Sequence, residues 1–205
     1  MVCAAAAQQT QVEILTEEKG VIYDAGTQLL TDRITKCRLK FPMEPTSKLT
    51  RVTTPHGIIM VRSHTANLGD MVLTMTQTKH PKQLLETMGV DLAKNTDVEK
   101  FIDMSSEHGA RSRKDAKVRS RMERTLENGV KGLEQAISYP GAEDGSYETG
   151  LTIERTFMHN GLLYVVFAEV TREVLERDRN TPKRVLELLD SFTLLTTTKE
   201  EEAKK

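Results

Sequence analysis

Alternating apolar and polar residues predict a group of strands in the first half of the chain. Leu39 and Phe41 alternate with basic residues, which places the two apolar side chains on one face of a strand. Together with β-branched residues and turn residues at the ends, this pattern predicts strands over residues 37–42, 49–54, 58–64 and 71–78. Because short connections join the last three, they are expected to pair antiparallel.

The apolar spacing changes to a helical period after this group of strands. Apolar residues recur three and four positions apart up to about Gly109 and are interrupted near Gly89 and Asn95, so one broken helix or two short helices are expected. A last helix is expected to begin at Thr181, whose side chain can cap free backbone amides, with a proline in its first turn. Residues 110–128 are highly charged with few apolar anchors, and they are expected to form a solvated helix or a long loop.

A second group of strands is predicted in the remaining half. Strands are predicted within residues 133–139 and 151–171. The second range contains an Asn-Gly dipeptide, which is typical of tight hairpin turns. Within this range, residues 162–168 form a continuous apolar run, which is typical of a central strand covered on both faces. A closing strand is predicted at residues 191–195.

These elements indicate one domain with helices on both faces of a sheet. The chain is divided into a flexible N-terminal segment, residues 1–20, a single domain, residues 21–195, and a charged flexible tail, residues 196–205. Helices after the third strand and after the penultimate strand can cover opposite faces. The expected fold class is therefore α+β, a three-layer α/β/α sandwich with a central, mainly antiparallel sheet.

Residues 39–45, 55–57, 155–166 and 189–194 share their turns and apolar positions with a known family. Through these segments the chain resembles the PsbP-like α/β/α sandwich family over about residues 37–195. That family includes an extrinsic photosystem II subunit and an import factor that binds the Ran GTPase, and its members are not known for shared catalytic residues. The resemblance implies an accessory or docking role, and it assigns no individual residue.

The charge balance limits the kinds of partner. The 29 basic and 30 acidic residues give a net charge of −1, so no overall field attracts nucleic acid or an anionic membrane. No apolar run reaches the roughly eighteen residues of a spanning helix. The protein is expected to be soluble, either cytoplasmic or, if Ala4–Ala7 mark a trimmed presequence, exported or organellar. The sequence leaves the oligomeric state open.

The sequence contains no familiar motif for catalysis, cofactors or metals. It lacks GxSxG, GxxxxGK[ST] and GxGxxG, so neither enzymatic activity nor a cofactor is expected. His56, His64 and Asp70 could approach one another around one strand, but exposed turn and strand-end residues are the favoured interpretation, and no metal site is predicted. Cys3 and Cys37 are interpreted as unpaired thiols.

The most suggestive local feature is a cluster of positive charge. It is expected to bind a protein partner, and it consists of Arg111, Arg113, Lys114, Lys117, Arg119, Arg121 and Arg124. An acidic protein fits this cluster better than nucleic acid, because the interleaved aromatic residues that stack on bases are absent. The alternative interpretation is a solvated, poorly ordered loop.

The sequence therefore favours a non-catalytic accessory or docking protein that binds a larger protein assembly through the basic cluster or a sheet edge. The alternative is a small-molecule or lipid carrier with a pocket between sheet and helices, lined by Met71, Met75 and Phe167. A hydrolase with an unfamiliar site is a third hypothesis.

Overall fold

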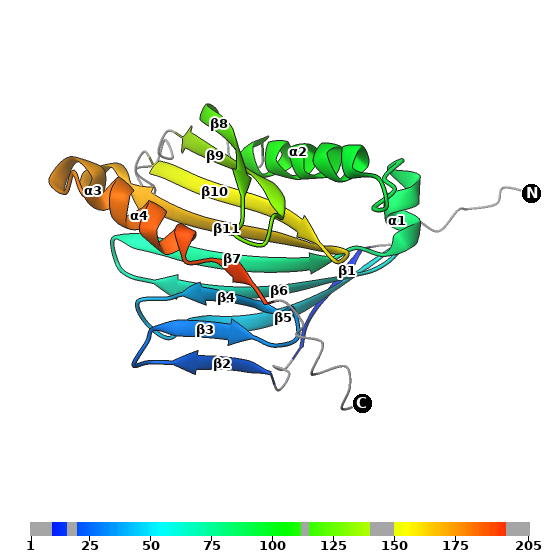
Figure 1. Ribbon diagram of the computed structural model, residues 1–205, viewed down its shortest axis with the longest axis horizontal. Coiled ribbons are helices and arrows are strands. Elements are labelled where there is room, and N and C mark those ends of the chain that lie inside the picture. The colour runs from blue at the N-terminus through cyan, green and yellow to red at the C-terminus, as the bar shows by residue number, and fades with distance from the viewer. Residues whose placement is uncertain (1–9, 16–19, 112–114, 140–149, 196–205) are drawn as a thin grey trace, which may run out of the picture.

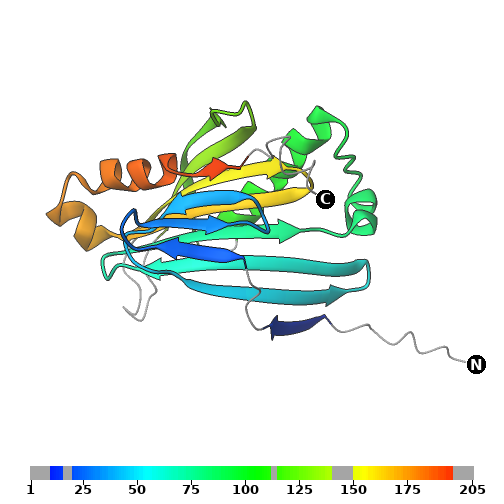
Figure 2. The ribbon, with the colours of Figure 1, turned by 60° about the horizontal axis from the view of Figure 1, so that its bottom comes forward.

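The computed structural model describes residues 10–15, 20–111, 115–139 and 150–195, and its largest element is an eight-stranded antiparallel sheet (Figure 1). In the order in which they pair, its strands are β1 (Gln11–Leu15), β5 (Thr46–Thr54), β6 (Gly57–Asn67), β7 (Met71–Lys79), β11 (Leu162–Thr171), β10 (Gly150–His159), β9 (Lys131–Tyr139) and β8 (Lys117–Thr125). Strands β1 and β8 are the two edges, and Figure 2 shows β1 at the margin of the sheet next to β5.

A four-stranded antiparallel sheet packs on one face of the large sheet. In pairing order, its strands are β12 (Thr193–Leu194), β4 (Cys37–Lys40), β3 (Leu29–Asp32) and β2 (Val21–Asp24). The hydroxyl of Tyr164 on β11 donates to the carbonyl oxygen of Thr35, in the turn between β3 and β4, at 2.6 Å. This hydrogen bond connects the two sheets.

Four helices in the described part of the chain lie on both sides of the large sheet. Helices α1 (Lys82–Thr87) and α2 (Asn95–Arg111) lie on the face away from the small sheet, where α2 contacts β9 and β10. Helices α3 (Arg172–Arg177) and α4 (Thr181–Asp190) lie on the other face. Helix α4 begins at Thr181 as predicted, but its cap residue is Asn180, and the Thr181 side chain makes no capping bond.

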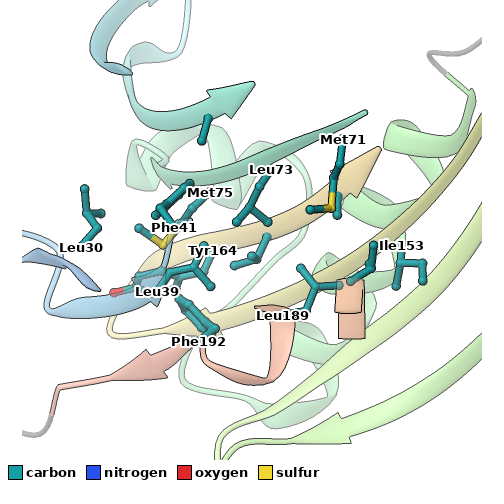
Figure 3. Close-up of a cluster of buried hydrophobic side chains, with 14 of the residues drawn as sticks. Leu30, Leu39, Phe41, Met71, Leu73, Met75, Ile153, Tyr164, Leu189 and Phe192 are labelled. Atoms are coloured by element: carbon teal, nitrogen blue, oxygen red, sulfur yellow. The ribbon is translucent and has the colours of Figure 1, made fainter. Parts of the chain in front are cut away.

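The main core lies between the large sheet and the layer formed by the small sheet and α4. Leu39 and Phe41, the alternating pair recognised in the sequence, are both fully buried there. Figure 3 shows them beside Leu73, Met75 and Tyr164 of the large sheet. A smaller cluster on the opposite face joins α1 and α2 to β10 and β11, and its buried members are Leu85, Val90, Phe101, Ile102, Met158 and Leu163.

The predicted three-layer α/β/α sandwich is wrong. Of the described residues, 51% lie in strands and 23% in helices, and the strands form two antiparallel sheets. Residues 21–32, where the sequence predicted no element, form β2 and β3, and β4 pairs with them rather than with the large sheet. The small sheet thereby occupies much of the face that was assigned to a layer of helices.

Individual elements agree with the sequence wherever alternation and turn residues coincide. The two predicted hairpins are confirmed as β5–β6 and β10–β11, and the region after β7 contains two helices. The prediction for residues 110–128 is wrong, because β8 lies there. Its alternation is hidden because nearly all of its side chains are exposed on an edge strand, so neither face carries a run of apolar residues.

The central strand predicted at residues 162–168 is confirmed in part. It forms most of β11, which lies between β7 and β10. One of its faces is sealed, since Tyr164, Val166 and Ala168 are buried in the main core. On the other face, Leu163 is buried under α1 and α2, whereas Phe167 is half-exposed. The helices therefore cover only part of this face.

Candidate partner-binding surface

The predicted basic cluster lies on and beside β8, and much of its charge is neutralised within the chain. Arg113 and Lys114 fall outside the described residues. Arg111, at the end of α2, pairs with Glu107 at 3.1 Å, and Arg121 pairs with Asp103 at 2.9 Å. The arginine side chains of the cluster are thus partly engaged by carboxylates of α2.

Arg124 belongs to a partly buried ion network rather than to a free surface. It donates two hydrogen bonds to the carboxylate of Glu134, at 3.0 and 3.1 Å. The same carboxylate accepts from buried Arg155 at 2.7 Å, and Arg155 also donates to Asp190 at 2.6 Å. Burial opposes ionisation of Glu134, but hydrogen bonds from the two arginines outweigh it and hold its pKa below the ordinary value.

Lys117 and Arg119 are the members of the cluster that have no carboxylate partner in the described part of the chain. Arg119 donates to the hydroxyl of Ser138 at 2.6 Å, and both basic side chains are exposed. The positive charge that remains available to a partner is therefore concentrated at the start of β8.

The structure does not bring His56, His64 and Asp70 together. His56 is half-buried in the turn between β5 and β6, His64 is fully buried, and Asp70 pairs with Arg177. In the described ranges, no group of three or more histidine, cysteine or acidic side chains could hold a metal ion.

His64 instead lies between a serine and an aspartate. Ser47 Oγ is 2.7 Å from His64 Nδ1, and His64 Nε2 is 3.4 Å from Asp32 Oδ2. Because a carboxylate can only accept, the contact with Asp32 requires a proton on Nε2. Arg62 Nε lies 3.3 Å from the same carboxylate oxygen. The sequence missed this cluster because its members come from β3, β5 and β6.

The order Ser47–His64–Asp32 is that of a hydrolase triad, but its surroundings are those of a structural contact. His64 and Asp32 have no exposed surface, and the main cavities of the described part are lined by other residues. A nucleophile needs room for a substrate and donors for an oxyanion beside it. Since β3 belongs to the small sheet and β5 and β6 to the large one, the cluster joins the two sheets.

The residues expected to line a carrier pocket do not face one another. Met71 and Met75 are buried in the core between the sheets, whereas Phe167 lies opposite Thr74 on the other face of the large sheet. A cavity lined by all three residues is therefore absent from the described structure.

An apolar surface lies on β1 and the neighbouring strands. Directly opposed residues of antiparallel strands share a face, and the register aligns one row through Val12 and a second through Ile14. These two rows, here called the open face, consist of Val12, Ile14, Thr50, Val52, Ile59, Val61 and Thr78. Thr78 is opposite Leu163, so the open face is on the same side as α1 and α2.

The open face continues to the edge of the sheet. Val12 is 66% exposed and Ile14 is 68% exposed, the largest exposures among the large apolar side chains of the described residues. The other members are partly buried by their neighbours, and none carries a charge. Helix α2 packs over β9 and β10, at the other end of the sheet. Two large aliphatic side chains are thus presented to solvent beside an uncharged strand surface.

No family model matches the chain, and no curated protein matches it. Among solved structures, it is similar to the solution structure of cyanobacterial PsbP (CyanoP) from Synechocystis, with 11% identity and a TM-score of 0.46, over 82% of this chain and 91% of that chain. It is also similar to the crystal structure of a protein of unknown function from Pseudomonas aeruginosa, with 9% identity and a TM-score of 0.41, over 73% of this chain and 98% of that chain. Likenesses this remote identify neither a partner nor a binding residue.

No helix in the described ranges combines the length and the apolar content needed to cross a membrane.

Sequence reasoning missed the open face because residues 1–20 were interpreted as a flexible segment. One signal was present. Val12 and Ile14 alternate with Gln11 and Glu13, which is the period of a strand with one apolar face. Five residues of alternation are a weak pattern when read alone, and only the pairing of β1 with β5 makes a surface of them.

Proposed function

We propose that this chain is a non-catalytic docking protein whose partner adds an extended segment to β1 and packs it on the open face. The observation that carries the proposal is the exposure of Val12 and Ile14 on an edge strand. Exposed apolar patches on soluble proteins are typical of interaction sites, because covering them removes apolar surface from water. The sealed position of His64 and Asp32 supports a role without catalysis.

The backbone of β1 also favours docking at this edge of the sheet. Among the described strands, β1 pairs only with β5, so its outer edge presents N–H and C=O groups to solvent. An extended peptide can satisfy these groups as an added strand, and alternate side chains then determine specificity. Every second side chain of the added strand would lie beside Val12 and Ile14 on the same face of the sheet. This favours a partner segment with β-branched or aromatic residues at every second position.

The opposite edge, β8, is less suited to strand addition. It carries Lys117, Arg119 and Arg121, and its register shifts between Val118 and Ser120. Charged side chains and bulges are features by which natural edge strands avoid pairing with other chains. An acidic partner at Lys117 and Arg119 is the second docking mode, and the experiment below separates it from binding at β1.

A different protein fits β1 better than a second copy of this chain. A symmetric antiparallel pairing of two β1 strands centred on Glu13 would place Val12 opposite Ile14 in both halves. The same register would place Glu13 directly opposite Glu13, and like charges in that position are destabilising. This register of a symmetric dimer is therefore disfavoured, and the partner that we propose is a heterologous protein.

The test compares matched apolar-to-lysine variants. The full chain is used to capture its partner from native extract, and affinity is then measured for the wild type, for Ile14→Lys and for Met104→Lys. Met104 is the control because it is 46% exposed on α2, away from β1. We expect Ile14→Lys to weaken binding by at least about tenfold, which corresponds to about 1.4 kcal/mol, and Met104→Lys to bind as the wild type does.

Hydrogen exchange on the complex locates the contact. Binding is expected to slow exchange of the β1 amides that point away from β5. A different outcome would place the docking site at the basic cluster. In that case binding would protect β8, the Lys117→Ala, Arg119→Ala double variant would lose binding, and Ile14→Lys would bind as the wild type does. Self-association that Ile14→Lys abolishes would replace the heterologous partner by a second copy.

A further inference from the structure

A second surface feature lies at the other end of the large sheet, in the groove between α2 and the hairpin formed by β8 and β9. Its volume is about 450 Å³, within the range of small-molecule sites. Its floor is apolar and includes the buried side chains of Ile102 and Met158. Gly129 and Gly132 line the hairpin side, and the space beside Gly129 is open.

The wall formed by α2 is acidic. Glu99 and Asp103 line it from one side of the helix, since they are four residues apart, and Glu123 lines it from β8. Asp103 forms an ion pair with Arg121, whereas Glu99 and Glu123 have no ion pair with any described residue. Lys131 is the one basic residue that lines the groove, so three carboxylates face one ammonium group.

We propose that this groove binds a small amphipathic cation, a protonated amine attached to an aliphatic or aryl body. The apolar floor accommodates the body by removing it from water, and the carboxylates of Glu99 and Glu123 attract the ammonium group. An organic anion would meet like charge at the same rim. A bare metal ion is a poor occupant, because the groove offers an apolar floor and the described residues contain no metal-binding group.

This site is independent of docking at β1, since β8 and β9 lie at the opposite end of the sheet from β1. It also differs from the carrier pocket that the sequence suggested, because none of Met71, Met75 and Phe167 lines it. Either proposal can therefore fail without the other.

The test uses three probes of one shape and different charge. The full chain with labelled methionine methyl groups is titrated with 4-phenylbutylamine, with 4-phenylbutanol and with 4-phenylbutyrate. Met158 reports on the groove, and Met88 and Met104, both exposed, report on non-specific binding. We expect the amine to shift the Met158 methyl resonance in a saturable way, the alcohol to bind several-fold more weakly and the acid more weakly still.

Charge-removing variants test the role of the rim. A Glu99→Gln, Glu123→Gln double variant keeps the shape of the groove, and it is expected to weaken binding of the amine by roughly three- to tenfold, because exposed ion pairs are weak individually. Glu173→Gln, on α3, is the control and is expected to leave binding unchanged. Equal affinity for amine and acid, an unchanged affinity in the double variant, or equal shifts at Met88, Met104 and Met158 would overturn the proposal.

Discussion

The carboxylate of Asp32 is fully buried, yet the surrounding groups favour its ionised form. Burial alone would raise its pKa, but hydrogen bonds from His64 and Thr35 and the charge of Arg62 outweigh burial. Its pKa therefore lies below the ordinary value of 3.8. Because the folded protein binds the Asp32 proton less tightly than the unfolded chain does, ionised Asp32 stabilises the folded state above that ordinary value, and the contribution is lost as the pH falls through the folded pKa.

We expect Asp32→Asn to lower the free energy of unfolding by about 3 kcal/mol at pH 7, because it removes one charge of the buried ion pair with Arg62. Urea unfolding of both proteins between pH 7 and pH 3 measures the difference. It should be constant above pH 5 and shrink below pH 4, as the wild-type carboxyl group becomes protonated. Glu187→Gln, at an exposed position on α4, serves as the control. A difference that stayed constant down to pH 3 would contradict ionisation as its source.

The pKa of Cys37 is shifted upward, whereas that of Asp32 is shifted downward, although both residues lie in the same buried region. Burial raises the pKa of its thiol to about 12, and no described side chain supplies a cation close enough to reverse this. Its neighbours are Thr35, Gln77 and Met75, which pack around the sulfur in the core between the sheets. Since the thiolate is the reactive form of cysteine, Cys37 is a packing residue.

At the scale of elements, the pairing of β9 with β10 depends on a glycine. Gly132 is opposite Phe157, whose ring stacks on Phe192 with a centroid distance of 5.5 Å. A Cβ atom at position 132 would overlap the Phe157 ring and the carbonyl oxygen of Thr156. The ring therefore occupies the space in which a side chain at position 132 would lie.

We expect Gly132→Ala to destabilise the fold by about 1–3 kcal/mol, the usual cost of overpacking. The control is Gly26→Ala, where the added atom would meet only the flexible carboxylate of Asp24 at 3.3 Å. Urea unfolding of the two variants gives the comparison. Equal stability of both variants would mean that the Phe157 ring moves aside without loss.

For the whole molecule, the order of the large sheet determines which parts open first. Strands β7, β11 and β10 have paired neighbours on both sides and carry the buried core, whereas β1 and β8 are edges. Local opening is easiest where few apolar contacts and many exposed backbone bonds coincide. The proposed docking strand is thus among the least protected parts of the free protein, and a partner would stabilise it.

Amide hydrogen exchange of the free chain, followed by mass spectrometry or NMR, tests this gradient. We expect the slowest exchange in β7, β10 and β11 and the fastest strand exchange in β1 and β8. Protection of β1 equal to that of β11 in the absence of a partner would indicate that its edge is already covered, and the docking proposal would lose its basis.

The sequence by itself determined the elements that local pattern encodes. Alternation around Leu39 and Phe41 located a buried strand, and turn residues located the hairpins β5–β6 and β10–β11. These predictions succeeded because one buried face or one tight turn produces a recognisable pattern within a few residues. For residues 117–125 the prediction failed, since a strand exposed on both faces has no such pattern.

Only the tertiary structure decided which layers meet and which surface is left uncovered. The pairing of β12 with β4 and the contact of Ser47, His64 and Asp32 join segments far apart in the chain. Val12 and Ile14 become a candidate site only because β1 ends the sheet and no described helix lies over it. Periodicity reports that a face is apolar, but the packing of distant segments determines whether that face is covered.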